Sequence, residues 1–249
     1  MRILTWGLLS ILIIDATSIQ SQTSKSSTTY FARAKERYAK GLLDDAIADY
    51  TTAIAFEPSY APFYNSRGIV LFTKGEADKA VADYDKAIEI DPEFAEAYNN
   101  RGTARFSQGK VEEAIIDYNR AIEIDPDYAE AYYNRGNARF MQRDLTASIA
   151  DYDRAVEIKP RYVFAYNNRG IAYFTLRDTK AAILNYNRAI QIDPMYAEAY
   201  ANRGLAHLFL GKAAAADKDF EQCFKLNPVL RPSVQKRVDE INRLRLLKQ

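Results

Sequence analysis

Residues 96–106 have the sequence EAYNNRGTARF, and close copies of this stretch recur along the chain. The copies are PFYNSRGIVLF at 62–72, EAYYNRGNARF at 130–140, FAYNNRGIAYF at 164–174 and EAYANRGLAHL at 198–208. Each copy starts 34 residues after the one before it. A fixed period of this length is typical of proteins built from stacked supersecondary units.

Each period contains two segments with the pattern of a helix. Around the stretch quoted above, apolar and small residues recur at three- and four-residue spacing over 96–108 and again over 112–124. Gly109 separates the two segments, and Pro126 ends the second because the residue before a proline disfavours helix. The pattern predicts six helix–turn–helix repeats over residues 27–230. Their ranges are 27–60, 61–94, 95–128, 129–162, 163–196 and 197–230.

Three features recur at fixed positions, counted from the start of each repeat. Position 8 is glycine in five repeats, and positions 20 and 27 hold small residues in all six. Positions 4 and 24 are aromatic throughout, which accounts for most of the 18 tyrosines. Small residues allow two helix axes to approach closely, and aromatic rings fill the wider gaps beside them. We therefore assign these tyrosines to the core.

This framework resembles the tetratricopeptide repeat, a 34-residue helix–turn–helix unit. The likeness extends over 27–230 without an insertion. It implies an all-α fold, a right-handed superhelical solenoid of six repeats. The chain departs from the family at two mid-repeat turns, where Arg143 and Arg177 replace the usual glycine. Asp144 and Asp178 follow them and are predicted to cap the second helix of their repeats.

The two ends of the chain lie outside the repeats. The apolar run 3–14 is short for a membrane span and predicts a signal peptide over 1–21, with an uncleaved membrane anchor as the alternative. Residues 22–29 are polar and are predicted to form a flexible linker. The expected location is therefore periplasmic or secreted. If the anchor is retained, the protein is attached to a membrane.

The last segment, 231–249, has the pattern of an amphipathic helix. Ser233 is predicted to cap it, and Val234, Val238, Ile241, Leu244 and Leu247 form its apolar stripe. A stacked array ends in an exposed helix face, which such a helix can cover. We expect a C-terminal capping helix. The alternative is a helix that joins two copies of the chain into a homodimer.

Arginine occupies position 7 of every repeat, where the tetratricopeptide family usually has leucine. A partly buried cation needs an anion, and position 23 supplies aspartate in five repeats and Asn185 in the fifth. We predict a structural ladder of ion pairs, formed either within a repeat or with the preceding one. It consists of Arg67, Arg101, Arg135, Arg169 and Arg203 with Asp83, Asp117, Asp151 and Asp219.

Positions 2, 6, 9 and 13 fall on one helical face, which in the family lines the concave groove. Side-chain amides at positions 6 and 9 can donate and accept at once, and could hold the backbone of an extended peptide at about 1 kcal/mol for each hydrogen bond. The other interpretation is that they are solvated polar residues. The predicted groove residues are Asn100, Asn134, Asn137, Asn168, Asn202, Glu96, Glu130 and Glu198.

The composition argues against several classes of function. With one histidine, His207, and one cysteine, Cys223, the chain lacks the residues for a catalytic triad or a thiolate metal site. We therefore predict no enzyme activity, no catalytic residue, no metal and no cofactor. A formal net charge of +1 gives no basic surface for nucleic acid.

The resulting hypothesis is a non-enzymatic scaffold that binds a protein or peptide segment in its concave groove. Glutamates on the groove face favour a basic or neutral segment. The alternative is a structural spacer that associates with itself through the terminal helix, for which exposed Leu246 and Leu247 would argue.

Overall fold

The computed structural model describes residues 16–246 and is all-α over that range, with paired helices throughout. The prediction of six helix–turn–helix repeats followed by a C-terminal capping helix is confirmed. The helices are α1 (Ala16–Ala39), α2 (Leu43–Phe56), α3 (Ala61–Thr73), α4 (Ala77–Ile90), α5 (Ala95–Ser107), α6 (Val111–Ile124), α7 (Ala129–Met141), α8 (Leu145–Ile158), α9 (Val163–Thr175), α10 (Thr179–Ile192), α11 (Ala197–Phe209), α12 (Ala213–Leu226), the 3₁₀ turn η1 (Pro228–Leu230) and α13 (Arg231–Leu246).

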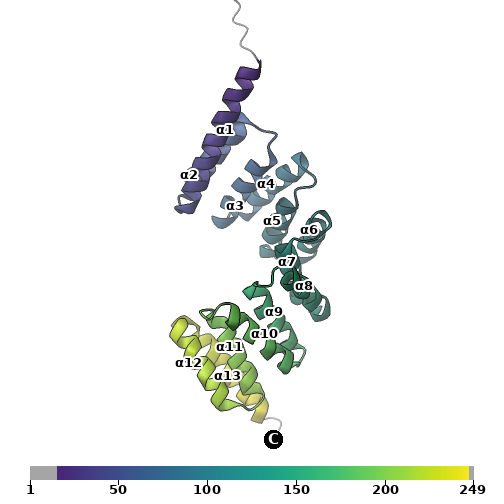
Figure 1. The fold of residues 1–249 in the computed structure, drawn as a ribbon, viewed down its shortest axis with the longest axis vertical. Coiled ribbons are helices and arrows are strands. Elements are labelled where there is room, and N and C mark those ends of the chain that lie inside the picture. Colours follow the sequence, from purple (N-terminus) through teal and green to yellow (C-terminus); the bar gives the residue numbers. More distant parts are fainter. Residues whose placement is uncertain (1–15, 247–249) are drawn as a thin grey trace, which may run out of the picture. The chain divides into compact units, whose positions relative to one another are not determined.

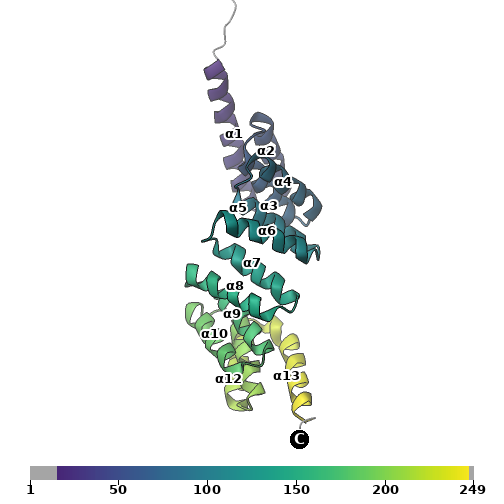
Figure 2. The ribbon, with the colours of Figure 1, turned by 90° about the vertical axis from the view of Figure 1, so that its right-hand side faces the viewer.

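The chain divides into two compact units, Met1–Pro92 and Glu93–Gln249. The N-terminal unit contains α1 to α4, and the C-terminal unit contains α5 to α13. Within the C-terminal unit the helix pairs follow one another in chain order (Figure 1, Figure 2), and each pair packs on the next. Each odd-numbered helix from α3 to α11 begins at the first residue of a predicted repeat.

The prediction of a flexible linker over 22–29 is wrong, because α1 runs through that segment. Ser27 is fully buried, and its hydroxyl donates to Glu57 Oε2 at 3.0 Å. Once the packed part of a helix exists, each further turn costs much less than the first, so polar residues can continue it. The apolar run 3–14, on which the signal-peptide prediction rests, lies outside the described residues. Over the range the structure describes, no helix has the length and apolarity to cross a bilayer.

Close approach between the two helices of a repeat explains the glycine at position 8. A Cβ atom added at Gly136 would lie 2.8 Å from Cε1 of Tyr152, the aromatic residue at position 24 of the same repeat. Tyr152 is 1% exposed, so the ring has no room to move away. The same relation holds in the four other repeats that carry glycine at this position. The glycine and the ring together fix the distance between the paired helices.

The mid-repeat turn requires a left-handed backbone, whichever residue occupies it. Gly109 has φ of 78°, and Arg143 and Arg177 adopt φ of 66° and 68° at the equivalent places. The caps predicted to follow them are confirmed, since Asp144 Oδ1 accepts from the Ala147 amide and Asp178 Oδ1 from the Ala181 amide. The two arginine turns therefore keep the geometry of the glycine turns.

Helix α13 packs on α11 and covers the end of the last repeat (Figure 1). Val234 is 4% exposed and packs in a cluster with Ala197, Ala201 and Cys223. The predicted cap at Ser233 is wrong, because the helix begins at Arg231 and the Ser233 hydroxyl donates back to the Leu230 carbonyl. The preceding turn η1 starts the helix instead. Of the predicted apolar stripe, Leu244 and Leu247 have side chains outside the described residues.

Candidate functional site

The structure brings the position-7 arginines together with aspartates of their own repeats. In each of five repeats the guanidinium lies 2.6–2.7 Å from the position-23 carboxylate. These pairs are Arg33–Asp49, Arg67–Asp83, Arg101–Asp117, Arg135–Asp151 and Arg203–Asp219. In the fifth repeat, Arg169 Nε donates to Asn185 Oδ1 at 2.7 Å instead. The pair links the first helix of a repeat to its second.

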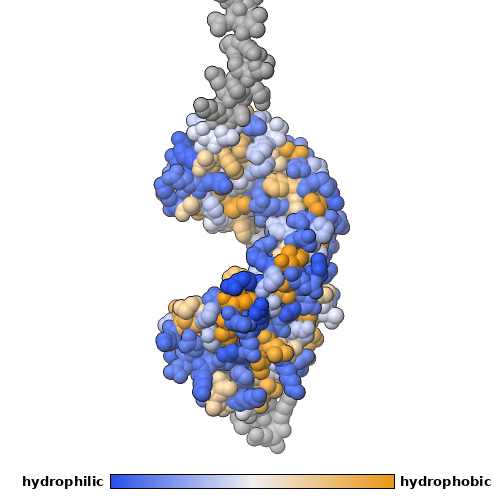
Figure 3. All heavy atoms as spheres, viewed as in Figure 1, coloured by the Kyte–Doolittle hydropathy of each residue, from blue (hydrophilic) through white to orange (hydrophobic). Residues whose placement is uncertain are grey.

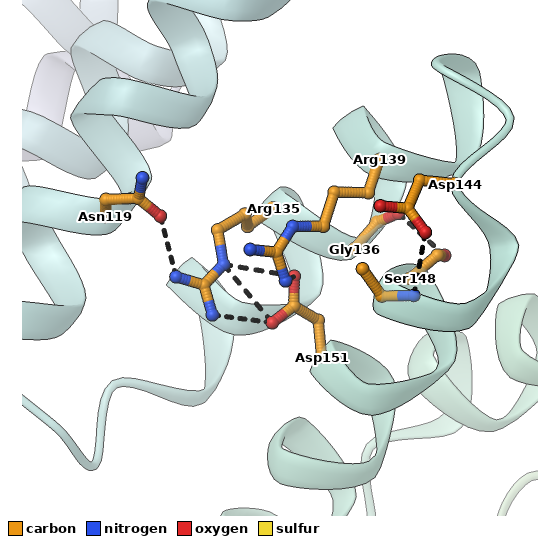
Figure 4. A network of polar contacts seen from close by, with 8 residues as sticks. Asn119, Arg135, Gly136, Arg139, Asp144, Ser148 and Asp151 are labelled. Carbon is orange, nitrogen blue, oxygen red and sulfur yellow. Dashed lines mark hydrogen bonds and ion pairs between the residues drawn. The ribbon is translucent and has the colours of Figure 1, made fainter.

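The fourth repeat shows the arrangement in full (Figure 4). Arg135 donates through Nε and NH2 to both carboxylate oxygens of Asp151, which is 2% exposed. Arg139, one turn further along α7, donates to Asp151 Oδ2 at 2.9 Å. A nearly buried carboxylate thus has two cations, which offset its loss of hydration. The first and third repeats have the same second arginine, at Arg37 and Arg105.

Four of the arginines also reach the preceding repeat, at a position that the sequence analysis did not name. Arg135 NH1 donates to Asn119 Oδ1 at 2.7 Å, and Arg203 NH1 donates to Asn187 Oδ1 at the same distance. Arg67 makes the equivalent bond to Thr51, and Arg169 pairs with Asp153. These acceptors all occupy position 25. Both options left open by the sequence are therefore realised, through different nitrogens of one guanidinium.

The arginines lie over tyrosine rings as well. In every repeat the guanidinium carbon is 4.8–5.8 Å from the centroid of the position-4 ring, which is a cation–π distance. Hydrogen bonds from Arg33 hold the pKa of Asp49 below its usual value. A side chain with this many partners is occupied by the fold and is not available to a ligand.

The asparagines bridge neighbouring repeats instead of standing free. Asn134 Nδ2 donates to Asn99 Oδ1, and Asn202 Nδ2 donates to Asn167 Oδ1, each at 2.9 Å. In both cases an amide at position 6 contacts an amide at position 5 of the preceding repeat. Asn202 is 7% exposed and also accepts from Arg237 of α13. Much of the hydrogen-bonding capacity predicted for a peptide is therefore used within the C-terminal unit.

Asn137 and Asn168 form a distinct polar cluster with two tyrosines. Asn168 Nδ2 donates to Asn137 Oδ1 at 2.9 Å and to the Tyr133 hydroxyl at 3.1 Å. The Tyr152 hydroxyl donates to the same Asn137 oxygen at 2.7 Å, and burial raises the pKa of Tyr152, so the hydroxyl stays protonated. Asn137, Asn168 and Tyr152 of this cluster help to line an apolar hollow of about 230 Å³ between α5, α7 and α9.

The predicted groove glutamates differ from one another. Glu130 Oε1 lies 2.6 Å from Lys159 Nζ, so its charge is already paired. Glu96 is exposed, and Glu198 is partly exposed near the start of α11. Because Lys159 already pairs with Glu130, the expected preference for a basic or neutral segment has little support from that residue.

The surface has no single large apolar patch on the side that Figure 3 shows, where hydrophobic residues form small groups among polar ones. Among residues of the described part of the chain, no group of three histidine, cysteine or acidic side chains lies close enough together to hold a metal ion.

Comparison with known families identifies the repeats. A model described as TPR repeat matches residues 34–75, 70–109, 102–142 and 178–211, and two models described as tetratricopeptide repeat match 129–162 and 197–229. The chain belongs to the tetratricopeptide repeat family. The matching models describe repeats, and none of them describes a catalytic domain. A comparison with curated protein sequences gives no match.

Several solved structures are similar to this chain. The crystal structure of MamA is 30% identical with a TM-score of 0.60, and the match covers 66% of this chain and 96% of MamA. YrrB, described as a TPR protein with an unusual peptide-binding site, is 22% identical with a TM-score of 0.59 over 75% of this chain and 97% of its own. PilW, described as a type IV pilus biogenesis factor, is 20% identical with a TM-score of 0.75, and the match covers 84% of this chain and 97% of PilW. The last two likenesses are to the fold.

Two features of this site had a signal in the sequence that pattern analysis missed. Position 25 holds a hydrogen-bond acceptor in every repeat, as Thr51, Asp85, Asn119, Asp153, Asn187 and Glu221. Position 5 holds asparagine in three repeats, as Asn65, Asn99 and Asn167. Both follow the 34-residue period, and each could have been paired with the repeat that follows it.

Proposed function

We propose that this protein is a non-catalytic scaffold that binds an extended segment of a partner protein on the surface formed by α5, α7, α9 and α11. The observation that carries the proposal is the apolar hollow beside Asn137 and Asn168, which lies on this surface and is lined from three successive repeats. Tetratricopeptide repeats commonly present such a surface to proteins, and the description of YrrB names a peptide-binding site.

The proposal differs from the sequence hypothesis in how the segment is held. The sequence hypothesis required four asparagine amides to hold the backbone of a bound peptide. In the structure, Asn134, Asn168 and Asn202 each donate a hydrogen bond to a neighbouring repeat. Apolar contacts in the hollow therefore carry more of the binding than amide hydrogen bonds do. The arginines take no part, because they hold the repeats together.

A photo-crosslinking amino acid placed at two matched positions tests this function. Met141 lines the hollow and is 63% exposed, whereas Leu184 lies on the second helix of the fifth repeat and is 68% exposed. We expect the probe at Met141 to crosslink the full chain to a partner in its native host, and the probe at Leu184 to give no such adduct. Adducts from Leu184 alone would move the binding site to the second-helix surface.

The alternative of a self-associating spacer has less support. The apolar residues Val234 and Val238 of α13 pack within the same chain. Leu246 and Leu247, which prompted the alternative, have side chains outside the described residues. Sedimentation of the purified chain at increasing concentration distinguishes the two, since a spacer is expected to dimerise and a scaffold to stay monomeric.

We also propose that the protein is exported, on the basis of the apolar run 3–14. Mass spectrometry of the chain recovered from its native host is expected to show loss of the segment up to about residue 21. A full-length chain found in the membrane fraction would indicate the anchor instead.

A further inference from the structure

We infer that the hollow between α5, α7 and α9 is an anchor pocket for one neutral apolar side chain, and that Asn137 Nδ2 donates a hydrogen bond to the main-chain carbonyl beside that side chain. The inference rests on the proposed function and specifies what the bound segment must contain. The occupant is an extended protein segment with leucine, isoleucine, methionine or phenylalanine at the anchor position.

The walls of the pocket are apolar. They come from Phe106 of α5, Phe140 and Met141 of α7, and Ile171 of α9. A cavity of about 230 Å³ is small for a cofactor or a drug-sized ligand. It exceeds the cavities of about 150 Å³ that accept a benzene ring in other proteins. The size therefore suits one branched aliphatic side chain or one phenyl ring.

The charge of the pocket restricts the occupant further. None of the residues that line it is ionised at neutral pH. A charged side chain would lose hydration there without gaining a counter-ion, which is unfavourable. Met141 at the rim is flexible and can adapt to occupants of different shape. The pocket thus favours a neutral side chain without demanding one exact shape.

Asn137, which lines the pocket, supplies one fixed hydrogen-bond donor. The Asn137 amide oxygen already accepts from the Tyr152 hydroxyl and from Asn168 Nδ2, which fixes the orientation of the amide. Its nitrogen is thereby held on the opposite side, and it donates to none of the described residues. An amide N–H group that donates to no protein atom gains stability when a ligand supplies a hydrogen-bond acceptor. The main-chain carbonyl next to the anchored side chain is such an acceptor.

The pocket is specific to this place in the array. Position 9 is asparagine in the fourth repeat alone, whereas the fifth and sixth repeats have Ile171 and Leu205. Leu205 is 1% exposed, in a helix on which α13 packs. The next boundary along the C-terminal unit therefore has no equivalent amide donor, and its aliphatic residue is already covered.

Peptide selection tests the inference. A random dodecapeptide library displayed on phage is selected against the full chain, and the strongest binder is synthesised with a fluorescent label. We expect the binders to share one leucine, isoleucine, methionine or phenylalanine. Replacing that residue with alanine is expected to weaken binding, measured by fluorescence anisotropy, about tenfold or more.

Matched variants of the protein assign the effect to the pocket. Met141→Lys places a cation at the rim and is expected to weaken binding about tenfold, whereas Met195→Lys makes the same change at a methionine that is 70% exposed and does not line the pocket. Asn137→Asp keeps both hydrogen bonds accepted from Tyr152 and Asn168 but removes the donor, so it should also weaken binding. Thermal melting checks that each variant is folded.

The outcomes separate this inference from the proposed function. Peptides that bind wild type, Met141→Lys and Asn137→Asp equally would overturn the anchor pocket and leave a scaffold that binds elsewhere. A library from which no peptide binds would overturn both. A dimer of the chain that Met141→Lys dissociates would show that a second copy occupies the pocket, which also contradicts a partner segment.

Discussion

The arginine at position 7 contacts several structural partners with one side chain. In the fourth repeat Arg135 holds Asp151 of its own repeat and Asn119 of the preceding one, and it lies over the Tyr132 ring. Leucine, which the family usually has here, could fill space but could join neither repeat by hydrogen bonds. A buried carboxylate with no cation is strongly destabilising, so the arginine and the aspartate depend on each other.

Arg135→Leu is expected to lower the free energy of unfolding by about 3 kcal/mol, because it leaves Asp151 with Arg139 as its one cation. The double variant Arg135→Leu/Asp151→Leu should recover most of that loss, since no carboxylate stays buried and the partly exposed Arg139 can turn its guanidinium to water. Urea denaturation followed by circular dichroism measures both. A single variant as stable as wild type would mean that the pair is merely tolerated.

His207 makes stability depend on pH near neutrality. It occupies position 11 of the sixth repeat, and its Nε2 lies 3.8 Å from Asp219 Oδ2. Burial lowers the pKa of His207, so the folded chain favours the neutral ring. Protonation is therefore easier in the unfolded chain. The stability contribution is full above pH of about 6.5, the unfolded value, and is lost as pH falls through the folded pKa.

We expect the urea midpoint of the wild type to fall between pH 7.5 and pH 5.5, and that of His207→Gln to change less over the same interval. His207 is the one histidine of the chain, so the difference belongs to it. Parallel curves for the two proteins would assign the pH dependence to carboxylates instead.

At the scale of the element, the mid-repeat turn is set by backbone geometry. Four repeats have glycine there with φ between 76° and 89°, a conformation that glycine adopts without steric strain. Arg143 and Arg177 adopt the same region against the preference of a side chain with a Cβ atom. The aspartate caps that follow supply the compensation, since Asp144 and Asp178 each satisfy one free amide at the start of the next helix.

Arg143→Gly is expected to raise the free energy of unfolding by about 1 kcal/mol, because it removes the strain of a left-handed arginine. The reverse change, Gly109→Arg, should lower it by a similar amount, and no neighbouring atom within 4 Å would oppose the new Cβ. Arg177→Gly should gain less, since Arg177 lies over the Phe209 ring. Thermal melts of the three variants check this order of stabilities. A melting temperature of Arg143→Gly equal to that of wild type would show that the turn is unstrained.

At the scale of the whole molecule, the C-terminal unit ends in a helix that repeats the register of the others. Arg237 follows Arg203 by 34 residues, and Val234 follows Tyr200 by the same interval. Helix α13 therefore occupies the place of a seventh first helix, which explains why it packs on α11 and why Arg237 reaches Asn202. A stacked array needs its last apolar face covered, and this helix covers it.

The reactivity of Cys223 measures how well α13 covers the end of the array. It is fully buried beneath α13, and burial raises the pKa of its thiol, so both access and thiolate formation are suppressed. Val234→Asp should loosen α13 and raise the rate of reaction with a chromogenic disulfide reagent at least tenfold. Val229→Asp, at a residue 83% exposed, is the matched control and should leave the rate unchanged. Equal rates in both variants would mean that the repeats alone bury the thiol.

The fold was largely predictable from the sequence, and the site was not. Three sequence patterns indicated their structural roles. Glycine at position 8 and tyrosine at position 24 indicated close packing of the paired helices, and aspartate after each turn arginine indicated a helix cap. The amphipathic pattern of 231–246 indicated the C-terminal helix. Residues 22–29 were mistaken for a linker because their polarity suggests disorder, whereas the adjoining packed helix extends through them. The asparagines were assigned to a ligand because their partners lie one repeat away, at separations that a helical pattern does not reveal.

The sequence by itself determined the helix pairs, because the 34-residue period and the 3.6-residue helical period are local properties. It also indicated that position-7 arginines pair with position-23 aspartates, whereas the structure decided that Arg135 meets Asp151 of its own repeat. The tertiary structure alone decided where Asn137 and Asn168 point and that a cavity opens beside them. The reason is that these contacts depend on the distance between one helix pair and the next, which is set by close packing of all the side chains between them.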